Sequence, residues 1–564
     1  MPLVEALSSA FAPLIATIPI IWLLLGLAVF RLKALIVCPV GLLLSIGLAC
    51  LFWNFSPRLA AESALDGAVF AVWPILWIII AAFFTYNISL HTGSDKQIKQ
   101  LLADVSPDPR IQALIIAWGL GSFMEAVAGF GTAVVIPAAL LLSLGFRPML
   151  TAVVCLLSNT IAVAFGVVGI PMQTLALVTD LDVFALSSAV IVQLGLLTIA
   201  VPFFIVFCVT RSFRGVREVW MPTFLAGLVF AVAQYFVASS IGPELAAVVG
   251  AICSILAIVI ATRLFPVRSI WALDTKEDDG PERQASQGDS QALAASSERS
   301  GSAASPGSSR TGADPDSVYD TLSGTIAAAP SRVQLSEQLK AWSPYIFLFF
   351  LVVFSSKLVP PVHALLGQVK SVLPIYSGTG AKPLIIPWLT TPGTLVLAAA
   401  ILGGLWQGAK VPDLLRIYGR TLKQLASSCV TIVSIVCMAK VLSYSGMMLQ
   451  LSATLADLAG GAYPALAPFI GALGSFITGS DTSANILFGD LQKQVALQLQ
   501  LDPVWIAASN TSGACIGKLL SPQNIALAAV ATGMAGQEGK LLSVGLLYAT
   551  PFLLFLGGLV FVLA

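Results

Sequence analysis

Long apolar stretches without a charged side chain recur along this sequence, and they constrain its fold more than any other feature. Phe11 to Phe30 and Val183 to Thr210 are two of them. Each is long enough for a helix to cross the hydrocarbon core of a bilayer, which takes about 20 residues. Charged residues make up 10% of the chain, against about 25% in soluble domains. The sequence therefore predicts an all-α polytopic membrane protein.

About twelve stretches predict transmembrane helices, namely those near 11–30, 33–53, 65–90, 149–171, 183–210, 220–239, 244–265, 342–360, 390–406, 424–446, 502–520 and 541–563. Arg31 and Lys33 follow the first of them. Because basic loops stay in the cytoplasm, the N-terminus is predicted to lie outside. The basic loops after the third, fifth, seventh and ninth stretches then all face the cytoplasm, and the C-terminus lies outside. We expect a multi-pass protein of the plasma (cell inner) membrane.

Residues 274–340 have a different composition, rich in Ser, Gly, Ala, Pro and charge. Such a segment cannot bury enough apolar surface to compensate for the entropy lost on ordering. We expect a disordered cytoplasmic linker between two membrane halves. A passive tether and a regulatory segment both fit this composition.

Two apolar runs are too long to cross the membrane once. Ile111–Phe146 has 36 residues with Glu125 as its one charge, and Leu458–Gly489 has 32 residues with Asp481 as its one charge. A helix of the first length would measure about 54 Å, against a hydrocarbon core of about 30 Å. Glycines and prolines interrupt both runs, and irregular backbone at membrane depth needs protein or water around it. The sequence predicts re-entrant hairpins near 111–146 and 458–489.

The two halves share sequence anchors at a nearly constant offset. Gly121-Ser122-Phe123 recurs as Gly474-Ser475-Phe476, and Ser158-Asn159-Thr160 recurs as Ser509-Asn510-Thr511. The predicted topology runs the matching helices in opposite directions, which gives two inverted repeats as in many secondary transporters. The resulting domains are a first repeat, two linking helices, the linker and a second repeat, over 1–218, 219–273, 274–340 and 341–564.

Broken helices expose free N–H and C=O groups, and a bound anion can satisfy the N–H groups. The hydroxyl and amide side chains near the breaks suit a small solute that has a carboxylate and a hydroxyl. The same side chains also form hydrogen bonds between membrane helices. The candidate substrate-binding residues are Ser122, Gly129, Gly131, Ser158, Asn159, Thr160, Ser475, Thr478, Ser480, Thr482, Ser483, Asn485, Asn510, Thr511, Lys518 and Gln523.

Glu125, Asp481 and Lys518 are the charges deepest in these segments, and ionisable groups inside a membrane are usually functional. Desolvation by Phe123, Met124 and Phe130 would favour the neutral form of the Glu125 carboxyl, which suits proton exchange near neutral pH. Glu125 and Asp481 are therefore the candidates for proton coupling.

The partner of Lys518 is left open, since it can pair with Asp481 or receive a substrate carboxylate. A structural cap at Glu125 and a structural ion pair at Lys518 are the simpler alternatives. Because the repeats share a scaffold but not their charges, we expect Glu125 to carry the proton. The second half, with Lys518, then contributes more of the substrate site.

Other classes of function find less support. The eight cysteines all fall in apolar segments, which is not typical of a disulfide framework or a zinc site. The sequence has no H-E-x-x-H and no G-x-S-x-G motif, so we expect neither an enzyme nor a cofactor or metal. No Lys/Arg cluster indicates nucleic acid. A sodium-coupled carrier of other small organic anions is the main alternative, and a channel is a weaker one.

Four long motifs identify a family. They are GSFMEAVAGFGTAVVIPAALL at 121–141, SNTIAVAFGVVGIP at 158–171, TGSDTSANILF at 478–488 and SNTSGACIGKLLSPQNIALA at 509–528. With them the chain resembles the lactate permease family, the proton-coupled symporters of lactate and glycolate. The resemblance covers both membrane halves and implies uptake of a 2-hydroxy monocarboxylate, such as L-lactate, D-lactate or glycolate, together with a proton. The expected partners are this substrate, protons and the lipid bilayer. The long polar linker departs from what the family leads us to expect.

Overall fold

A computed structural model describes residues 2–26, 30, 32, 34–94, 106–127, 129, 131–266, 270–271, 335–355, 359–379, 381, 383–534 and 537–564. These residues belong to one compact unit, residues 1–271 with 333–564. Several positions used above lie outside the described residues, namely Arg31, Lys33, Phe130 and residues 274–334 of the predicted linker.

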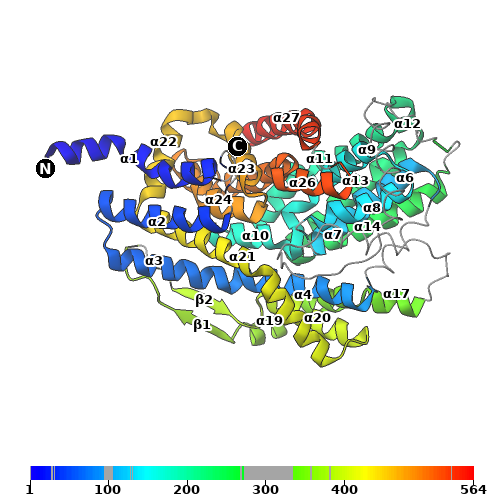
Figure 1. Ribbon diagram of the computed structural model, residues 1–564, viewed down its shortest axis with the longest axis horizontal. Helices are drawn as coiled ribbons and strands as arrows, with labels where there is room; N and C mark the ends of the chain where they lie inside the picture. Colours follow the sequence, from blue (N-terminus) through cyan, green and yellow to red (C-terminus); the bar gives the residue numbers. More distant parts are fainter. Residues whose placement is uncertain are drawn as a thin grey trace, which may run out of the picture. The chain divides into compact units, whose positions relative to one another are not determined.

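The described residues of the first half form helices joined by turns and loops, and they include no strand (Figure 1). Its elements are α1 (Pro2–Leu24), α2 (Ala34–Phe52), α3 (Pro57–Phe70), η2 (Ala71–Leu76), α4 (Trp77–Thr92), α6 (Pro109–Ala113), η3 (Leu114–Leu120), α7 (Gly121–Val127), α8 (Thr132–Ser143), α9 (Pro148–Ala162), η4 (Val163–Phe165), α10 (Gly166–Thr179), α11 (Val183–Thr210), α12 (Phe213–Glu218), α13 (Trp220–Ser240) and α14 (Pro243–Leu264).

The second half adds one small sheet to its helices. Its elements are α17 (Leu335–Ala341), α18 (Ser343–Ser355), α19 (Pro360–Leu366), β1 (Lys370–Leu373), β2 (Leu384–Pro387), α20 (Pro392–Trp406), α21 (Val411–Tyr444), α22 (Met447–Ala459), η5 (Gly460–Ala462), α23 (Tyr463–Thr478), α24 (Asp481–Gln498), α25 (Pro503–Gly517), η6 (Lys518–Leu520), α26 (Pro522–Ala531) and α27 (Glu538–Leu563). The two strands pair antiparallel, with Lys370 opposite Pro387. The sequence analysis did not predict this hairpin.

The predicted all-α membrane fold is confirmed. Among the described residues, eight helical stretches are long and apolar enough to cross a membrane, and eleven if each of three bent helix pairs counts as one crossing. The count of twelve stays a prediction. Several helices begin where a capping side chain precedes a proline, as at Asp502-Pro503 and Ser521-Pro522, which is the expected chemistry of a helix start.

Both runs that are too long for one crossing contain helices that fold back on one another. In the first, α8 packs against α7 and η3, and in the second, α24 packs against α23 (Figure 1). The turn between α23 and α24 passes through Gly479, whose φ is 70°. Positive φ costs little at glycine because it has no Cβ. These contacts support the predicted hairpins, while their entry and exit on one side of the membrane stay a prediction.

The two halves also pack in a reciprocal way. Helix α10 of the first half contacts α24 of the second, and α26 of the second half contacts α8 of the first. Likewise α2 packs against α21, and α20 packs against α4. At the offset between the sequence anchors, α8 corresponds to α24, α10 to α26, α2 to α20 and α4 to α21, so each of these contacts has its counterpart. The pattern supports the internal duplication inferred from the sequence, which remains a proposal.

One helix start in the first half has an unusual backbone. Val167, Val168 and Gly169 in α10 have φ values of 46°, 57° and 75°. The left-handed region is sparsely populated by β-branched residues. Gly169 lies against the backbone of Pro243, where a Cβ would come within 2.7 Å of its carbonyl. This turn separates α9 from the main part of α10, so the predicted crossing at 149–171 is two helices joined by a break.

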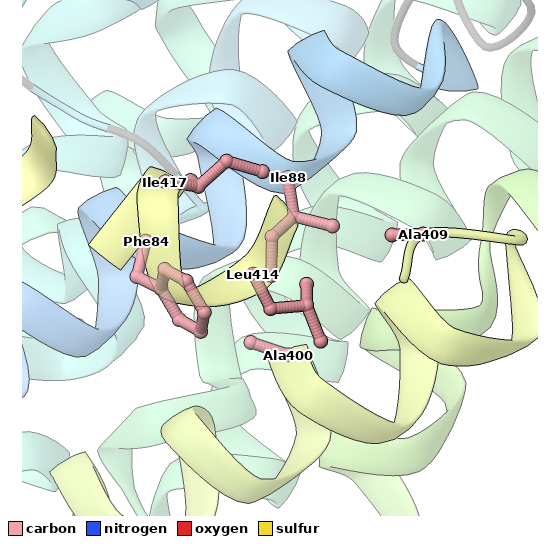
Figure 2. Packing of buried hydrophobic residues seen from close by; sticks show 6 residues of the cluster. All are labelled: Phe84, Ile88, Ala400, Ala409, Leu414 and Ile417. Atoms are coloured by element: carbon pink, nitrogen blue, oxygen red, sulfur yellow. The ribbon is translucent and has the colours of Figure 1, made fainter. Parts of the chain in front are cut away.

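A buried apolar cluster joins α4 to α20 and α21 (Figure 2). Its members are Phe84, Ile88, Ala400, Ala409, Leu414 and Ile417. They come from both halves of the sequence, and each is at most 9% exposed. The cluster fixes these three helices relative to one another, although Phe84 and Ile88 are more than 300 residues away in the sequence from its other members.

We predict that Gly513→Ala destabilises the fold by about 3 kcal/mol or more, because overpacking between helices forces backbones apart. A Cβ at Gly513 would overlap the carbonyl group of Pro468, where α25 meets α23. Gly558→Ala is the control, since a Cβ there meets nothing within 4 Å. Thermal unfolding in detergent measures both, and equal melting temperatures for the two variants would contradict this packing.

Candidate functional site

A cavity of about 620 Å³ lies between the two halves. Its walls come from α7, η4 and α10 of the first half and from α21, the α23–α24 turn, η6 and α26 of the second, with α2 and α4 at the edge. Among the described residues, three charged side chains line it, Glu125, Asp481 and Lys518. The polar lining consists of Ser428, Thr431, Thr478, Ser480, Thr482, Ser483, Gln523 and Asn524, and the apolar lining includes Leu35, Ile79, Val163, Val167, Ile170 and Ile432.

A buried ion pair joins the two halves inside this cavity. Lys518 Nζ donates to Glu125 Oε1 at 2.8 Å, and the two side chains are 8% and 3% exposed. The other oxygen of Glu125 has no hydrogen-bond partner among the described residues. Gly166 makes room for this carboxylate, because a Cβ there would lie 3.0 Å from Oε1. The pair answers the question that the sequence left open, since Lys518 bonds to Glu125 and not to Asp481.

Asp481 lies at the first position of α24 and is 2% exposed. Its Oδ2 accepts a weak hydrogen bond from the Cys515 thiol at 3.7 Å, and its Oδ1 has no partner in the part of the chain that the structure describes. With Lys518 and both carboxylates ionised, the site would have one excess negative charge. A buried charge without a partner costs several kcal/mol, so the protonation state of the site is tied to what binds in it.

Two helix N-termini point at the same cavity. Ser480 caps α24 by accepting from the backbone N–H of Ser483 at 3.2 Å, and Ser521 caps α26 by accepting from that of Asn524 at 3.3 Å. The first turn of a helix carries partial positive charge and unpaired N–H groups. Together with Lys518 these two termini make the region around Thr482 and Gln523 suited to a carboxylate.

The structure gathers eight of the predicted site residues at the cavity, namely Glu125, Thr478, Ser480, Asp481, Thr482, Ser483, Lys518 and Gln523. The other predicted residues do not line it: Ser122, Gly129, Gly131, Ser158, Asn159, Thr160, Ser475, Asn485, Asn510 and Thr511. Most of these have partners within the protein, which gives them structural roles.

Asn485, Asn510 and Thr511 form one buried network. Asn485 Oδ1 accepts from Asn510 Nδ2 and from Thr511 Oγ1, both at 2.9 Å. Asn485 Nδ2 donates to the carbonyl of Pro171 at 3.1 Å. The network ties α24 to α25 and to α10 of the other half. Its side chains are satisfied without a substrate.

The Ser-Asn-Thr motif of the first half makes different hydrogen bonds from the one in the second half. Ser158 donates to the carbonyl of Ala117, and Thr160 donates to Leu156 of its own helix at 3.2 Å. Asn159 Oδ1 and the hydroxyl of Ser122 are buried and have no partner among the residues that the structure describes. In the second half Ser475 donates to the carbonyl of Ala514 at 2.6 Å.

Gly129 and Gly131 serve close packing. Their φ values are 55° and 90°, and a Cβ at either would overlap Val167 or Leu527, respectively. They let the turn between α7 and α8 lie against α10 and α26. The same turn flanks Glu125, so the glycines position the carboxylate without lining the cavity.

Sequence reasoning missed Ser428, Thr431 and Asn524. The two hydroxyl residues are three positions apart on α21, the spacing that puts side chains on one helix face. Asn524 follows Gln523 in the fourth family motif, and its Nδ2 donates to the carbonyl of Lys518 at 3.1 Å. This bond fixes η6, and with it the lysine, against α26.

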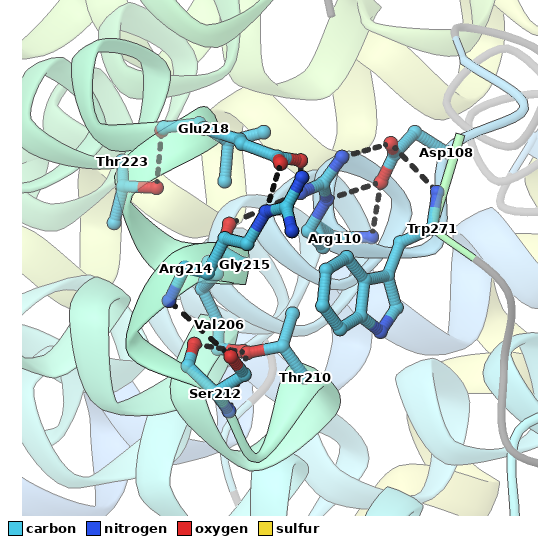
Figure 3. Close-up of polar contacts among 11 residues, drawn as sticks. Asp108, Arg110, Val206, Thr210, Ser212, Arg214, Gly215, Glu218, Thr223 and Trp271 are labelled. Atoms are coloured by element: carbon cyan, nitrogen blue, oxygen red, sulfur yellow. Dashed lines mark hydrogen bonds and ion pairs between the residues drawn. The ribbon is translucent and has the colours of Figure 1, made fainter. Parts of the chain in front are cut away.

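Away from the cavity, Arg110 is fully buried in a second charged cluster (Figure 3). Its guanidinium donates to Asp108 Oδ1 and Oδ2 at 3.0 and 2.8 Å, to Glu218 Oε2 at 3.0 Å and to the carbonyl of Gly215 at 3.0 Å. The ring of Trp271 lies 5.2 Å from it. The cluster ties the start of the first hairpin to α12 and to Trp271, which follows α14 in the sequence.

We predict that Arg110→Met lowers stability by about 3–5 kcal/mol, because it leaves two carboxylates without their buried partner. Arg214→Met is the matched control, since Arg214 pairs with the same Glu218 at 3.4 Å but its side chain is 85% exposed. Exposed pairs contribute about 0–1 kcal/mol. Thermal unfolding of the two purified variants tests the difference, and similar melting temperatures would refute the role of Arg110.

Nearly the whole chain is similar in sequence to known proteins. The sequence model of the family described as L-lactate permease matches residues 12–564. An L-lactate permease of Streptococcus iniae is 38% identical over 505 residues, which cover 90% of this chain and 95% of that one. The glycolate permease GlcA of Escherichia coli is 32% identical over 548 residues, covering 94% and 91%. The YdaH transporter of Alcanivorax borkumensis aligns with a TM-score of 0.33 and 14% identity, over 82% of this chain and 86% of that one.

Proposed function

The chain belongs to the L-lactate permease family, and on that premise we propose that it is a proton-coupled symporter of L-lactate. Related 2-hydroxy monocarboxylates, D-lactate and glycolate, are further substrates, since the relatives include a glycolate permease. Family membership and the apolar helices indicate a multi-pass membrane transporter. Uptake across the plasma membrane by alternating access, with both termini outside, completes the proposal.

The observation that carries the proposal is the buried Lys518–Glu125 pair in a cavity that two helix N-termini enter. A lactate carboxylate that reaches this site meets the lysine and the N–H groups of α24 and α26. It competes with Glu125 for Lys518, because both are carboxylates and one ammonium group cannot fully compensate two buried negative charges.

Charge balance then couples the proton to the substrate. Binding adds one negative charge to a buried site, and protonation of Glu125 removes one. The neutral Glu125 releases Lys518 to the substrate, and loss of the proton on the other side restores the pair and expels the anion. One proton therefore moves with each lactate. Thr482, Ser483 and Gln523 are the neighbouring side chains that we propose to contact the substrate.

The arrangement of the halves supports alternating access. The cavity is bounded by helices of both halves, and each half contributes a hairpin and a broken helix that pack on the other. Inverted repeats that meet at a midplane site allow one arrangement to open on either side of the membrane.

Uptake into liposomes tests the proposal. The purified protein is reconstituted, a pH gradient is imposed with and without a sodium gradient, and labelled L-lactate inside the vesicles is measured. We expect accumulation driven by the pH gradient and indifferent to sodium. Accumulation that requires sodium and ignores the pH gradient would favour a sodium-coupled carrier and reject proton coupling.

A further inference from the structure

The carboxyl group of Asp481 lies in the same cavity but takes no part in the ion pair. It is 2% exposed, and its buried Oδ1 has no hydrogen-bond partner within the described residues. Its Oδ2 has one weak donor, the thiol of Cys515 at 3.7 Å. An ionised carboxylate has about four lone-pair sites that need donors, so this environment is poorly suited to a charge.

The charged side chains near Asp481 do not compensate a negative charge on its carboxylate either. Among the described residues, Lys518 and Glu125 are the other charged side chains that line the cavity, and the Cys515 thiol contacts the carboxyl group of Asp481. The charge of Lys518 is already matched by Glu125 at 2.8 Å. Among the described residues, α10, α21, α22 and α23 bring no charged side chain to the cavity lining.

The sizes of two opposing energies decide whether the carboxyl group of Asp481 is charged or neutral. The N-terminus of α24 would favour a negative charge by about 0.3–1 kcal/mol, and by at most about 2 kcal/mol in partly buried sites. An uncompensated buried charge costs several kcal/mol. The carboxyl group of Asp481 is therefore neutral when Lys518 is paired. It also stays neutral when a substrate carboxylate replaces Glu125 on the lysine, because the balance is unchanged.

We propose that Asp481 remains protonated through the transport cycle and recognises the 2-hydroxyl group of the substrate. A neutral carboxyl group offers one donor and one acceptor, which match a hydroxyl group that is itself both. Lys518 and the helix N-termini take the substrate carboxylate, and Asp481 lines the cavity beside them. This inference rests on the proposed function, and it separates selection of the 2-hydroxy acid by Asp481 from carriage of the proton by Glu125.

Two variants and one substrate analogue test it. Propionate has the carbon chain of lactate without the hydroxyl group, so competition of L-lactate and propionate for labelled L-lactate uptake measures hydroxyl recognition. Sites that hydrogen-bond a substrate hydroxyl reject the analogue that lacks it by large factors. We expect wild type to prefer L-lactate at least about 100-fold. In Asp481→Leu the preference for L-lactate over propionate should fall at least about tenfold, while the affinity for propionate stays the same.

Asp481→Asn is the decisive second variant, because its amide keeps the shape, the donor and the acceptor of a neutral carboxyl. We expect its accumulation of L-lactate to remain driven by the pH gradient, with the same ratio of uptake with and without that gradient as in wild type. Loss of that accumulation, with lactate exchange intact, would make Asp481 the proton carrier and overturn the proposal. An undiminished preference for lactate in Asp481→Leu would also overturn it. A wild-type protein without pH-driven accumulation would instead reject the proposed function itself.

Discussion

Lys518→Met is expected to lower L-lactate uptake about 100- to 4,000-fold. The methionine keeps the apolar stem of the side chain but removes the one cation in the cavity lining of the described residues. Loss of a buried partner for a carboxylate costs about 3–5 kcal/mol, and each 1.4 kcal/mol is a factor of ten. Initial rates of labelled L-lactate uptake into liposomes measure the effect.

A structural role of the lysine would give the same loss by unfolding, so the design needs a second variant. Glu125→Gln combined with Lys518→Met removes both charges and leaves no unpaired carboxylate from the pair. We expect this double variant to melt close to wild type and still not transport. Lys540→Met is the control at an exposed lysine. Recovery of uptake in the double variant would show that Lys518 balances Glu125 and does not bind substrate.

Glu125→Gln is expected to abolish accumulation of lactate in a pH gradient while lactate exchange continues within about tenfold of wild type. The glutamine imitates the protonated form of Glu125, so Lys518 is always available to the substrate. The empty carrier would then bury an unpaired lysine, which costs several kcal/mol. Net transport needs the empty carrier, whereas exchange does not.

The measurement compares pH-driven uptake with exchange of internal unlabelled for external labelled L-lactate. Glu244→Gln is the matched control, because Glu244 accepts a hydrogen bond from Gln173 at 2.6 Å outside the cavity lining. It should leave both activities in place. Normal accumulation by the Glu125 variant would remove that residue from the coupling mechanism.

The sequence alone was enough to single out the acidic residues of this site, because charged residues are rare in its apolar runs. Glu125 and Asp481 stand out because each is the one charge in a long apolar run, and the cost of such charges points to function whatever the fold. The positions of most apolar helices followed from hydropathy for the same reason. The predictions of hairpins near 111–146 and 458–489 followed from the length of the two apolar runs and from the glycines within them.

Which side chains bond to one another could not be predicted from the sequence in this way. Lys518 and Glu125 are 393 residues apart, and no local pattern states which carboxylate the lysine meets. Asn510 and Thr511 have the same polarity whether they bind a substrate or Asn485, so the sequence placed them at the site and the structure places them beside it. The left-handed turn at Val167 and Val168 has no signal in the sequence, because valine disfavours that backbone region.

The central claim is that lactate takes Lys518 from Glu125 and that Glu125 then binds a proton. Proton uptake on substrate binding tests it most directly, with purified protein in weakly buffered detergent solution and a pH-sensitive dye. We predict about one proton taken up per L-lactate bound by wild type and by Asp481→Asn, and none by Glu125→Gln. Binding of L-lactate to wild type without proton uptake, or undiminished uptake in Glu125→Gln, would contradict the claim.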